Sequence, residues 1–90
     1  MPLNAPEVSI ELNEGKPKLS WKPVEGAVKY EVYRSTSKSG TYTKITTTSS
    51  ASYTDKSATK SKTYYYKVRA ITADGTAGAF SNPVSQKATK

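Results

Sequence analysis

Apolar and polar side chains alternate every second residue in seven short runs of this sequence. Between residues 63 and 71, for example, Tyr64, Tyr66 and Val68 alternate with Tyr65 and Lys67. Consecutive side chains of a β-strand point to opposite faces of a sheet, so a period of two predicts strands with one buried face. Turn residues such as Gly, Pro, Ser and Asp separate the runs, which are residues 8–12, 18–22, 29–34, 43–47, 52–54, 63–71 and 83–88.

Seven short strands at regular spacing, with no helical stretch between them, predict an all-β sandwich of two antiparallel sheets. A length of 90 residues suits one domain with a modest core. Apolar residues make up only 34% of the chain, a fraction that by itself would be compatible with disorder. Seven Tyr and many Val, Ile and Thr favour strands instead.

The alternation assigns each strand side chain to the core or to the surface. It divides the three adjacent tyrosines into two core residues and one surface residue. It also turns Leu12 inward and Ile71 outward. The expected core consists mainly of aromatic and β-branched side chains, which are those of Trp21, Tyr30, Val32, Tyr64, Tyr66 and Val68.

The residue inventory removes most catalytic chemistry. The chain has no Cys and no His, which excludes disulfides, thiol nucleophiles, imidazole bases and most zinc sites. Most carboxylates lie in turns or at outward strand positions. Asp55 lies at the end of a predicted strand and Asp74 precedes Gly75 in a predicted turn, and both are positions where Asp is common for structural reasons. No phosphate-binding, Ca²⁺-binding or dinucleotide-binding motif occurs. We therefore expect no enzymatic activity, no cofactor and no metal.

The net charge of +7 is unevenly distributed. Residues 1–31 carry four Lys and five Glu, whereas residues 32–90 carry ten Lys or Arg and two Asp. The segment DKSATKSK contains Lys56, Lys60 and Lys62, and such a group suits an anionic polymer. No aromatic residue for base stacking lies among them, so solvated loop charge is favoured and no nucleic-acid partner is expected. No apolar run approaches the roughly 20 residues of a membrane helix, so no membrane insertion is expected.

Several segments together resemble a fibronectin type III domain of the form common in bacterial extracellular proteins. They are KLSW for the second strand, YEVYRSTSKSGTYTKI for the third and fourth, SYTD, TYYYKVRAI for the sixth, and SNPVSQKAT for the last. The resemblance covers residues 5–89, which leaves residues 1–4 as a tail or as residues foreign to the natural protein. It implies a seven-stranded, immunoglobulin-like sandwich with sheets of three and four strands and with the termini at opposite ends.

The resemblance also gives two aromatic residues a specific place. It puts Trp21 in the core, on the second strand. It makes Tyr64 the tyrosine corner, a buried ring whose hydroxyl bonds a backbone group upstream, near Ala58. Such a bond is physically reasonable, because a buried hydroxyl without a partner costs about 1–3 kcal/mol.

The function implied by the resemblance is that of a non-catalytic spacer or interaction module in a larger secreted or cell-surface bacterial protein, such as a carbohydrate-active enzyme. The expected partners are the neighbouring domains of that protein and a polysaccharide or another protein, and the module itself is expected to be a monomer. The chain lacks the Arg-Gly-Asp tripeptide of related adhesive domains. An engineered scaffold of the same fold is an alternative, but the plain loops VEGAV and ADGTAG count against it.

A further alternative is a dedicated glycan- or protein-binding module. If the third and sixth strands are antiparallel neighbours, Tyr33, Tyr65, Lys67 and Arg69 share one exposed face of the larger sheet with Glu31. Aromatic rings beside cations suit sugar rings or a protein-binding hot spot. Tyrosine also fits exposed strand positions, and Glu31 opposite a cation is an ordinary cross-strand pair, so we favour the structural interpretation of this face.

Overall fold

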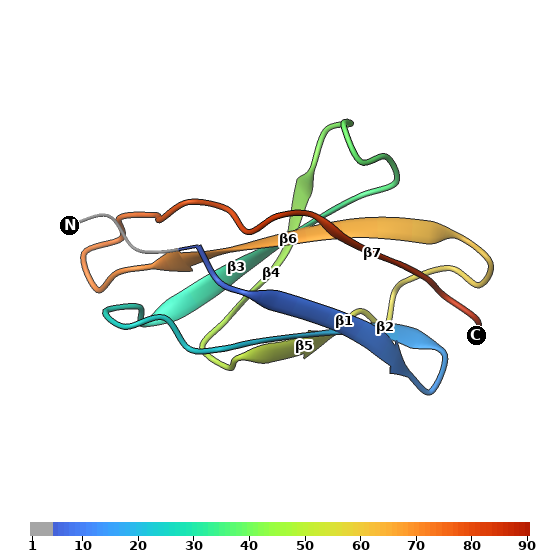
Figure 1. The fold of residues 1–90 in the computed structure, drawn as a ribbon, viewed down its shortest axis with the longest axis horizontal. Helices are drawn as coiled ribbons and strands as arrows, with labels where there is room; N and C mark the ends of the chain where they lie inside the picture. Colours follow the sequence, from blue (N-terminus) through green and yellow to red (C-terminus); the bar gives the residue numbers. More distant parts are fainter. Residues whose placement is uncertain (1–4) are drawn as a thin grey trace.

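Strands account for all the regular secondary structure in residues 5–90, the part of the chain that the computed structural model describes (Figure 1). The seven strands of this part are β1 (Val8–Asn13), β2 (Lys16–Trp21), β3 (Lys29–Ser35), β4 (Thr43–Thr48), β5 (Ser52–Thr54), β6 (Thr63–Ile71) and β7 (Val84–Lys87). Each corresponds to one predicted run, so the all-β class is confirmed. The tail expected at residues 1–4 lies outside the described residues.

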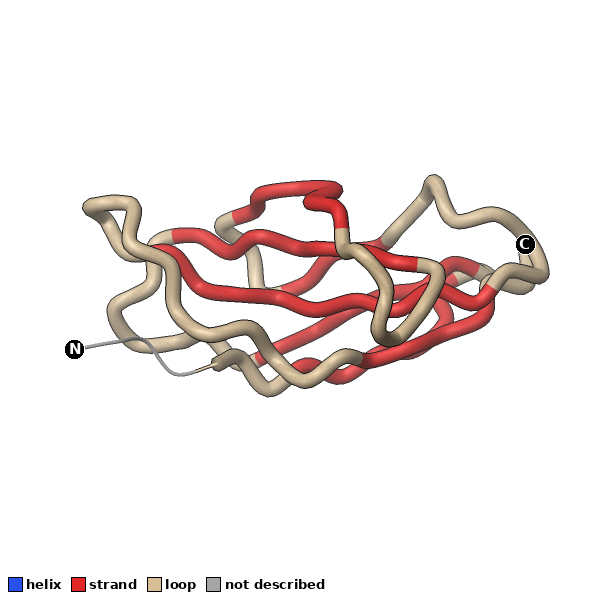
Figure 2. The backbone as a smooth tube through the Cα atoms, turned by 90° about the horizontal axis from the view of Figure 1, so that it is seen from above, coloured by secondary structure: helices blue, strands red, loops and turns tan. Residues whose placement is uncertain are grey.

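The strands form two antiparallel sheets that pack face to face. One sheet has three strands in the order β1-β2-β5, and the other has four in the order β4-β3-β6-β7, so the expected sizes are confirmed. The two longest strands, β3 and β6, are neighbours in the centre of the larger sheet. Figure 2 shows that most of the strands run roughly along the long axis of the molecule and that most loops lie toward its two ends.

The core lies between the sheets and is built from the inward side chains of both. Leu19 from β2 and Tyr66 from β6 are fully buried. The six residues expected in the core are all buried, which are Trp21, Tyr30, Val32, Tyr64, Tyr66 and Val68. Trp21 packs edge-to-face on Tyr30, with ring centroids 5.5 Å apart. Burial of one large apolar side chain contributes about 1.5–3 kcal/mol, so this cluster holds the two sheets together.

Two residues depart from the predicted alternation. Leu12 is predicted inside, but it is 38% exposed. It lies near the end of the edge strand β1, where burial fades after Ile10. Ile71 is predicted outside, but it is 4% exposed, because the segment after β6 folds back and forms a bridge between Ile71 and Ala77. The burial predicted from alternation is wrong at both positions, because alternation contains no information on which loops cover the end of a strand.

Different segments form the two ends of the molecule. At one end, the β1–β2 turn contains Glu14 and Gly15 with φ angles of 52° and 84°. Two successive positive φ angles give a two-residue turn whose twist matches that of a hairpin. The backbone amides of Thr89 and Lys90 donate to the Gly15 carbonyl, which fixes the C-terminal residues beside this turn. The chain enters β1 from the opposite end, as the resemblance implies (Figure 1).

Candidate functional site

β3 and β6 position most of the predicted surface residues. In their antiparallel register, Tyr33 is opposite Lys67, and Glu31 is opposite Arg69. These side chains point outward from the larger sheet, because the residues that alternate with them on both strands point into the core. Three of the four predicted face residues therefore meet here, together with Glu31.

Arg69 is the centre of a hydrogen-bonded network on this face. Its Nε donates to Glu31 Oε1 at 2.7 Å, and its Nη2 donates to the Tyr33 hydroxyl at 3.0 Å. Lys44 Nζ on β4 lies 3.5 Å from Glu31 Oε2. Burial alone would raise the pKa of Glu31, but the hydrogen bond and charge of Arg69, assisted by Lys44, outweigh it and lower the pKa below its ordinary value. Glu31 is therefore ionised at neutral pH and holds both cations in place.

Two aromatic residues that sequence reasoning missed complete the surface. Phe80, which precedes β7, packs edge-to-face on Tyr33 with ring centroids 4.9 Å apart. Lys67 Nζ lies 4.3 Å from the ring centroids of both Tyr42 and Phe80. Arg69 Cζ lies 4.8 Å from the Phe80 centroid and 5.3 Å from that of Tyr33. We call Tyr33, Tyr42, Lys67, Arg69 and Phe80 the aromatic–cation face.

The aromatic–cation face has its rings covered by its own cations. All five side chains are half-buried. A cation over an aromatic ring contributes about 0.5–1 kcal/mol at an exposed site, so each contact stabilises the sheet modestly. A sugar that stacks on a ring face occupied by Lys67 or Arg69 would have to displace that cation. The geometry thus supports a packed, stabilising surface more directly than an open binding platform.

Tyr65, the fourth predicted face residue, lies at the margin of this surface. It is opposite Ser35 on β3 and Ser85 on β7, two positions along β6 from Lys67. Burial raises the pKa of Tyr42, and the proximity of Tyr65 raises it further. Tyr65 is therefore part of the outer face of the larger sheet, at the end of β6 that pairs with both β3 and β7.

A buried polar network connects the loop that follows β5 to β3 and β6. Asp55 is fully buried, and it accepts hydrogen bonds from Tyr66 Oη at 2.6 Å, Arg34 Nη1 at 2.8 Å and Ser57 Oγ at 2.7 Å. Burial alone would raise the pKa of Asp55, but these hydrogen bonds and the Arg34 charge outweigh it and lower the pKa. Burial and the neighbouring Asp55 raise the pKa of Tyr66, so its hydroxyl remains a donor. Sequence reasoning identified Asp55 as structural but missed its partners.

The same loop contains the predicted tyrosine corner. The Thr59 amide donates to the Tyr64 hydroxyl at 2.9 Å, so the partner is the residue that follows the expected Ala58. This hydrogen bond lowers the pKa of Tyr64. Arg34 Cζ lies 4.9 Å from the centroid of the Tyr64 ring. Arg34 thereby links the corner to the Asp55 network.

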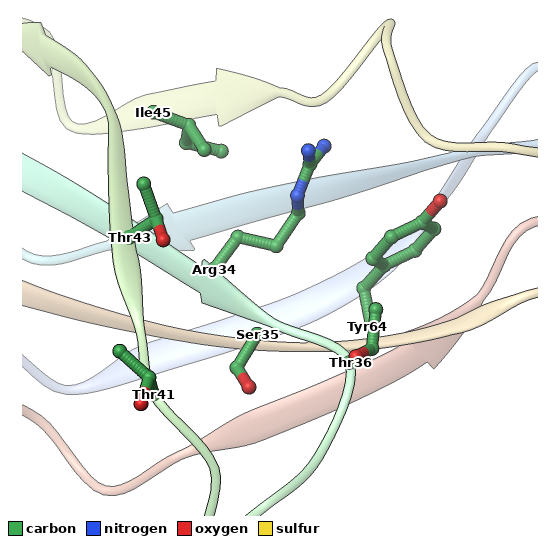
Figure 3. Close-up of a pocket in the computed structure, with 7 residues that line it drawn as sticks. All are labelled: Arg34, Ser35, Thr36, Thr41, Thr43, Ile45 and Tyr64. Atoms are coloured by element: carbon green, nitrogen blue, oxygen red, sulfur yellow. The ribbon is translucent and has the colours of Figure 1, made fainter.

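A pocket of about 320 Å³ lies beside Arg34 at the β4 edge of the sandwich (Figure 3). Its lining is Arg34, Ser35, Thr36, Thr41, Thr43, Ile45 and Tyr64. Figure 3 shows the Arg34 guanidinium between Ile45 and Tyr64. The Nη1 atom of this guanidinium is already bonded to Asp55 and Ser57. The lining contains no carboxylate, so the pocket offers hydrogen-bonding groups without an acid–base pair.

The carboxylates of both networks are paired with arginines rather than gathered in a cluster of acidic side chains. Within residues 5–90, no group of three or more His, Cys, Asp or Glu side chains is placed to hold a metal ion. The two carboxylates of the networks, Glu31 and Asp55, are each bound by an arginine. No helix in this part of the chain is long and apolar enough to cross a membrane.

No protein-family profile matches the chain. Among solved structures, the chain is similar to an Fn3-like protein from Clostridium thermocellum, with 31% sequence identity and a TM-score of 0.87. The similarity covers all of this chain and 97% of that one. The two molecules therefore agree in fold and in extent.

Two further similar proteins are much longer than this chain. An amylopullulanase from Thermoanaerobacter thermohydrosulfuricus is 41% identical over an alignment of 87 positions, and the match covers 91% of this chain and 6% of that protein. A β-1,2-glucanase structure from Parabacteroides distasonis is 27% identical, with a TM-score of 0.85, over 98% of this chain and 13% of that one. In both cases the chain corresponds to a small part of a longer enzyme.

Proposed function

Because the chain belongs to the fibronectin type III family, we propose that it is a non-catalytic accessory module of a larger carbohydrate-active enzyme. Residues 5–89 form this module, which acts as a spacer or interaction domain between the other domains of the enzyme. The observation that carries the proposal is the 41% identity to a region that makes up 6% of an amylopullulanase. The similarity to 13% of a β-1,2-glucanase supports the same setting.

The proposed setting of the parent enzyme is bacterial and outside the cell, either secreted or at the cell surface. Polysaccharides in the surroundings of a cell are too large to enter it intact, so the enzymes that first cleave them work outside the cell. A chain without cysteine is compatible with this setting, because its stability does not depend on disulfides. The proposed neighbours of the module are the catalytic or binding domains of the same protein.

A spacer has to keep its shape and hold its neighbours apart. The molecule measures 40 × 25 × 17 Å, and its strands run along the longest dimension (Figure 2). Hydrogen bonds from Thr89 and Lys90 to Gly15 fix the chain where it leaves the sandwich. These features support a stiff connection along the long axis.

A second candidate function is glycan or protein binding through the outer face of the larger sheet. Tyr33, Tyr65, Lys67 and Arg69 are the proposed contact residues. The clustering of further aromatic side chains beside them favours this candidate. It ranks second because the cations already cover the rings.

The test uses the 90-residue protein in a heteronuclear NMR titration with malto-oligosaccharides and in a reducing-sugar assay with starch and pullulan. A spacer leaves the spectrum unchanged at millimolar ligand and releases no sugar. Saturable shifts confined to Tyr33, Tyr65 and their strand neighbours support the second candidate instead. In that case, the Tyr33→Ala/Tyr65→Ala variant should lose the shifts while it remains folded, although the loss of the Tyr33 contacts with Phe80 and Arg69 lowers its stability. Release of sugar contradicts a non-catalytic module.

A further inference from the structure

Three separate segments that each carry lysine lie at the end of the molecule that holds the C-terminal residues (Figure 1). The segments are the β1–β2 turn with the start of β2, the loop between β5 and β6, and the chain from the end of β7. The basic end is defined by five of their lysines, which are Lys16, Lys56, Lys60, Lys62 and Lys87.

Backbone hydrogen bonds hold the three segments together. The Ser61 amide donates to the Ala88 carbonyl at 2.8 Å, and the Ala88 amide donates to the Lys62 carbonyl at 3.0 Å. The Thr89 amide donates to the Gly15 carbonyl at 2.8 Å. The relative positions of the lysine backbones are therefore set by the fold.

The side chains of the basic end are mostly exposed and form no ion pairs within residues 5–90. Four of the five lysines are exposed, and Lys16 is half-buried with its Nζ 2.6 Å from the Ala58 carbonyl oxygen. No ion pair between residues 5 and 90 includes any of the five. The three segments contain two carboxylate side chains, of which Asp55 is buried against Arg34 and Glu14 is exposed.

The opposite end of the molecule has a different balance of charge. Its exposed charged residues are Glu7, Glu25 and Asp74 with Lys22 and Lys29. Surface pockets at this end are lined by the first two glutamates with Lys22, and by Asp74 with the turn at Gly26. The long dimension of 40 Å exceeds the Debye length of about 10 Å at 0.1 M salt, so a ligand at one end is screened from the other.

From this arrangement we infer that the basic end binds a linear polysaccharide that bears repeated carboxylate groups. The lysines lie on turns and at a strand end, where a single exposed ion pair contributes little. Appreciable affinity therefore requires several anionic groups on one ligand, as in a polyuronate. The three segments contain no aromatic residue on which a nucleic-acid base could stack. The choice of a polysaccharide rests on the proposed function.

The test measures binding of an oligogalacturonate to the 90-residue protein by calorimetry and maps the contact by NMR. The Lys60→Gln/Lys62→Gln variant removes two exposed cations from the basic end, and Lys22→Gln/Lys29→Gln removes two from the opposite end. Both variants have the same net charge, and thermal unfolding checks that both are folded.

We expect the basic-end variant to bind about tenfold more weakly and the control variant to change by less than about twofold. Raising the salt concentration from about 50 to about 200 mM should weaken binding to the unmodified protein by about tenfold or more. Amide shifts should appear in residues 14–16, 56–62 and 87–90.

Three results would overturn the inference. One is the absence of binding at about 50 mM salt, and another is an equal loss in both variants, which would assign the effect to net charge alone. The third is single-stranded DNA of equal charge binding as tightly as the oligogalacturonate, which would exclude a preference for carboxylates. The neutral malto-oligosaccharides and the sugar-release assay test the accessory-module proposal separately, so the two proposals can fail independently.

Discussion

Tyr64 and Tyr66 point to the same side of β6, and their hydroxyl groups have different roles. The Tyr64 hydroxyl accepts a hydrogen bond from the Thr59 amide at 2.9 Å, whereas the Tyr66 hydroxyl donates to Asp55 at 2.6 Å. Both hydrogen bonds attach the loop between β5 and β6 to the core. The attachment of this loop to the core should therefore depend on the hydroxyl groups of these two tyrosines.

Tyr64→Phe should lower the free energy of unfolding by about 1 kcal/mol, measured by urea denaturation. This is the low end of the cost of losing a hydrogen bond, because Thr59 is exposed and its amide can turn to water. The matched control is Tyr65→Phe on the same strand, whose half-exposed side chain should tolerate the change within about 0.5 kcal/mol. Equal effects of the two variants would contradict the role of the corner.

Asp55 should make the protein less stable in acid. Its pKa is lowered in the folded state, so the folded protein binds this proton more weakly than the unfolded chain does. The resulting stabilisation is present above the unfolded pKa of about 3.9 and is lost as the pH falls through the lower folded value. Urea denaturation between about pH 5 and pH 2 should show this decline.

Asp55→Asn should remove this part of the pH dependence and lower the free energy of unfolding at neutral pH by about 3 kcal/mol. This is the low end of the cost of breaking a buried ion pair, because the Arg34 side chain is 26% exposed. The exposed Glu25→Gln is the control and should leave neutral-pH stability within about 0.5 kcal/mol. An unchanged acid decline in Asp55→Asn would assign the pH dependence to other carboxylates.

At the scale of elements, the pairing of β3 with β6 brings the aromatic–cation face together. Period two predicted the outward direction of Tyr33, Lys67 and Arg69, and the strand pairing of the fibronectin type III fold predicted that they share a surface. Tyr42 and Phe80 were missed because both lie outside the strands, in segments to which alternation does not apply. An isolated aromatic residue in a polar loop was the only available signal for them.

Phe80 and Lys67 should be energetically coupled. A double-mutant cycle with Phe80→Ala and Lys67→Met, measured by urea denaturation, should give a coupling energy of about 0.5–1 kcal/mol, because Lys67 Nζ lies 4.3 Å from the Phe80 ring centroid. The control cycle combines Phe80→Ala with Lys29→Met at the end of the molecule and should show no coupling. A coupling near zero in the first cycle would mean that the cation is solvated away from the ring.

At the scale of the whole molecule, the length and the separated ends determine how the module can connect its neighbours. Two copies joined head to tail through a short linker should form an extended particle. Small-angle X-ray scattering should give a maximum dimension of roughly twice the 40 Å length of one copy. A compact, side-by-side particle would contradict the spacer proposal, and a single copy measured in parallel is the control.

The fold class and most side-chain directions were determined by the sequence alone. Alternation and turn residues are local properties, and their effect does not depend on which strand lies next to a given strand. The same reasoning identified the core around Trp21 and the surface position of Tyr33. It was wrong at Leu12 and Ile71, which lie at strand ends, where burial depends on segments distant in the chain.

Only the tertiary structure decided which distant side chains meet. Asp55 accepts hydrogen bonds from Arg34 and Tyr66 because β3 and β6 place these two side chains beside it. Nothing in the sequence around Asp55 indicates that residues so far apart in the chain are in contact. The basic end likewise assembles from three segments that are far apart in the chain. Composition sets the amount of charge, but the packing of the two sheets determines where the charge is concentrated, because it fixes which turns share an end of the molecule.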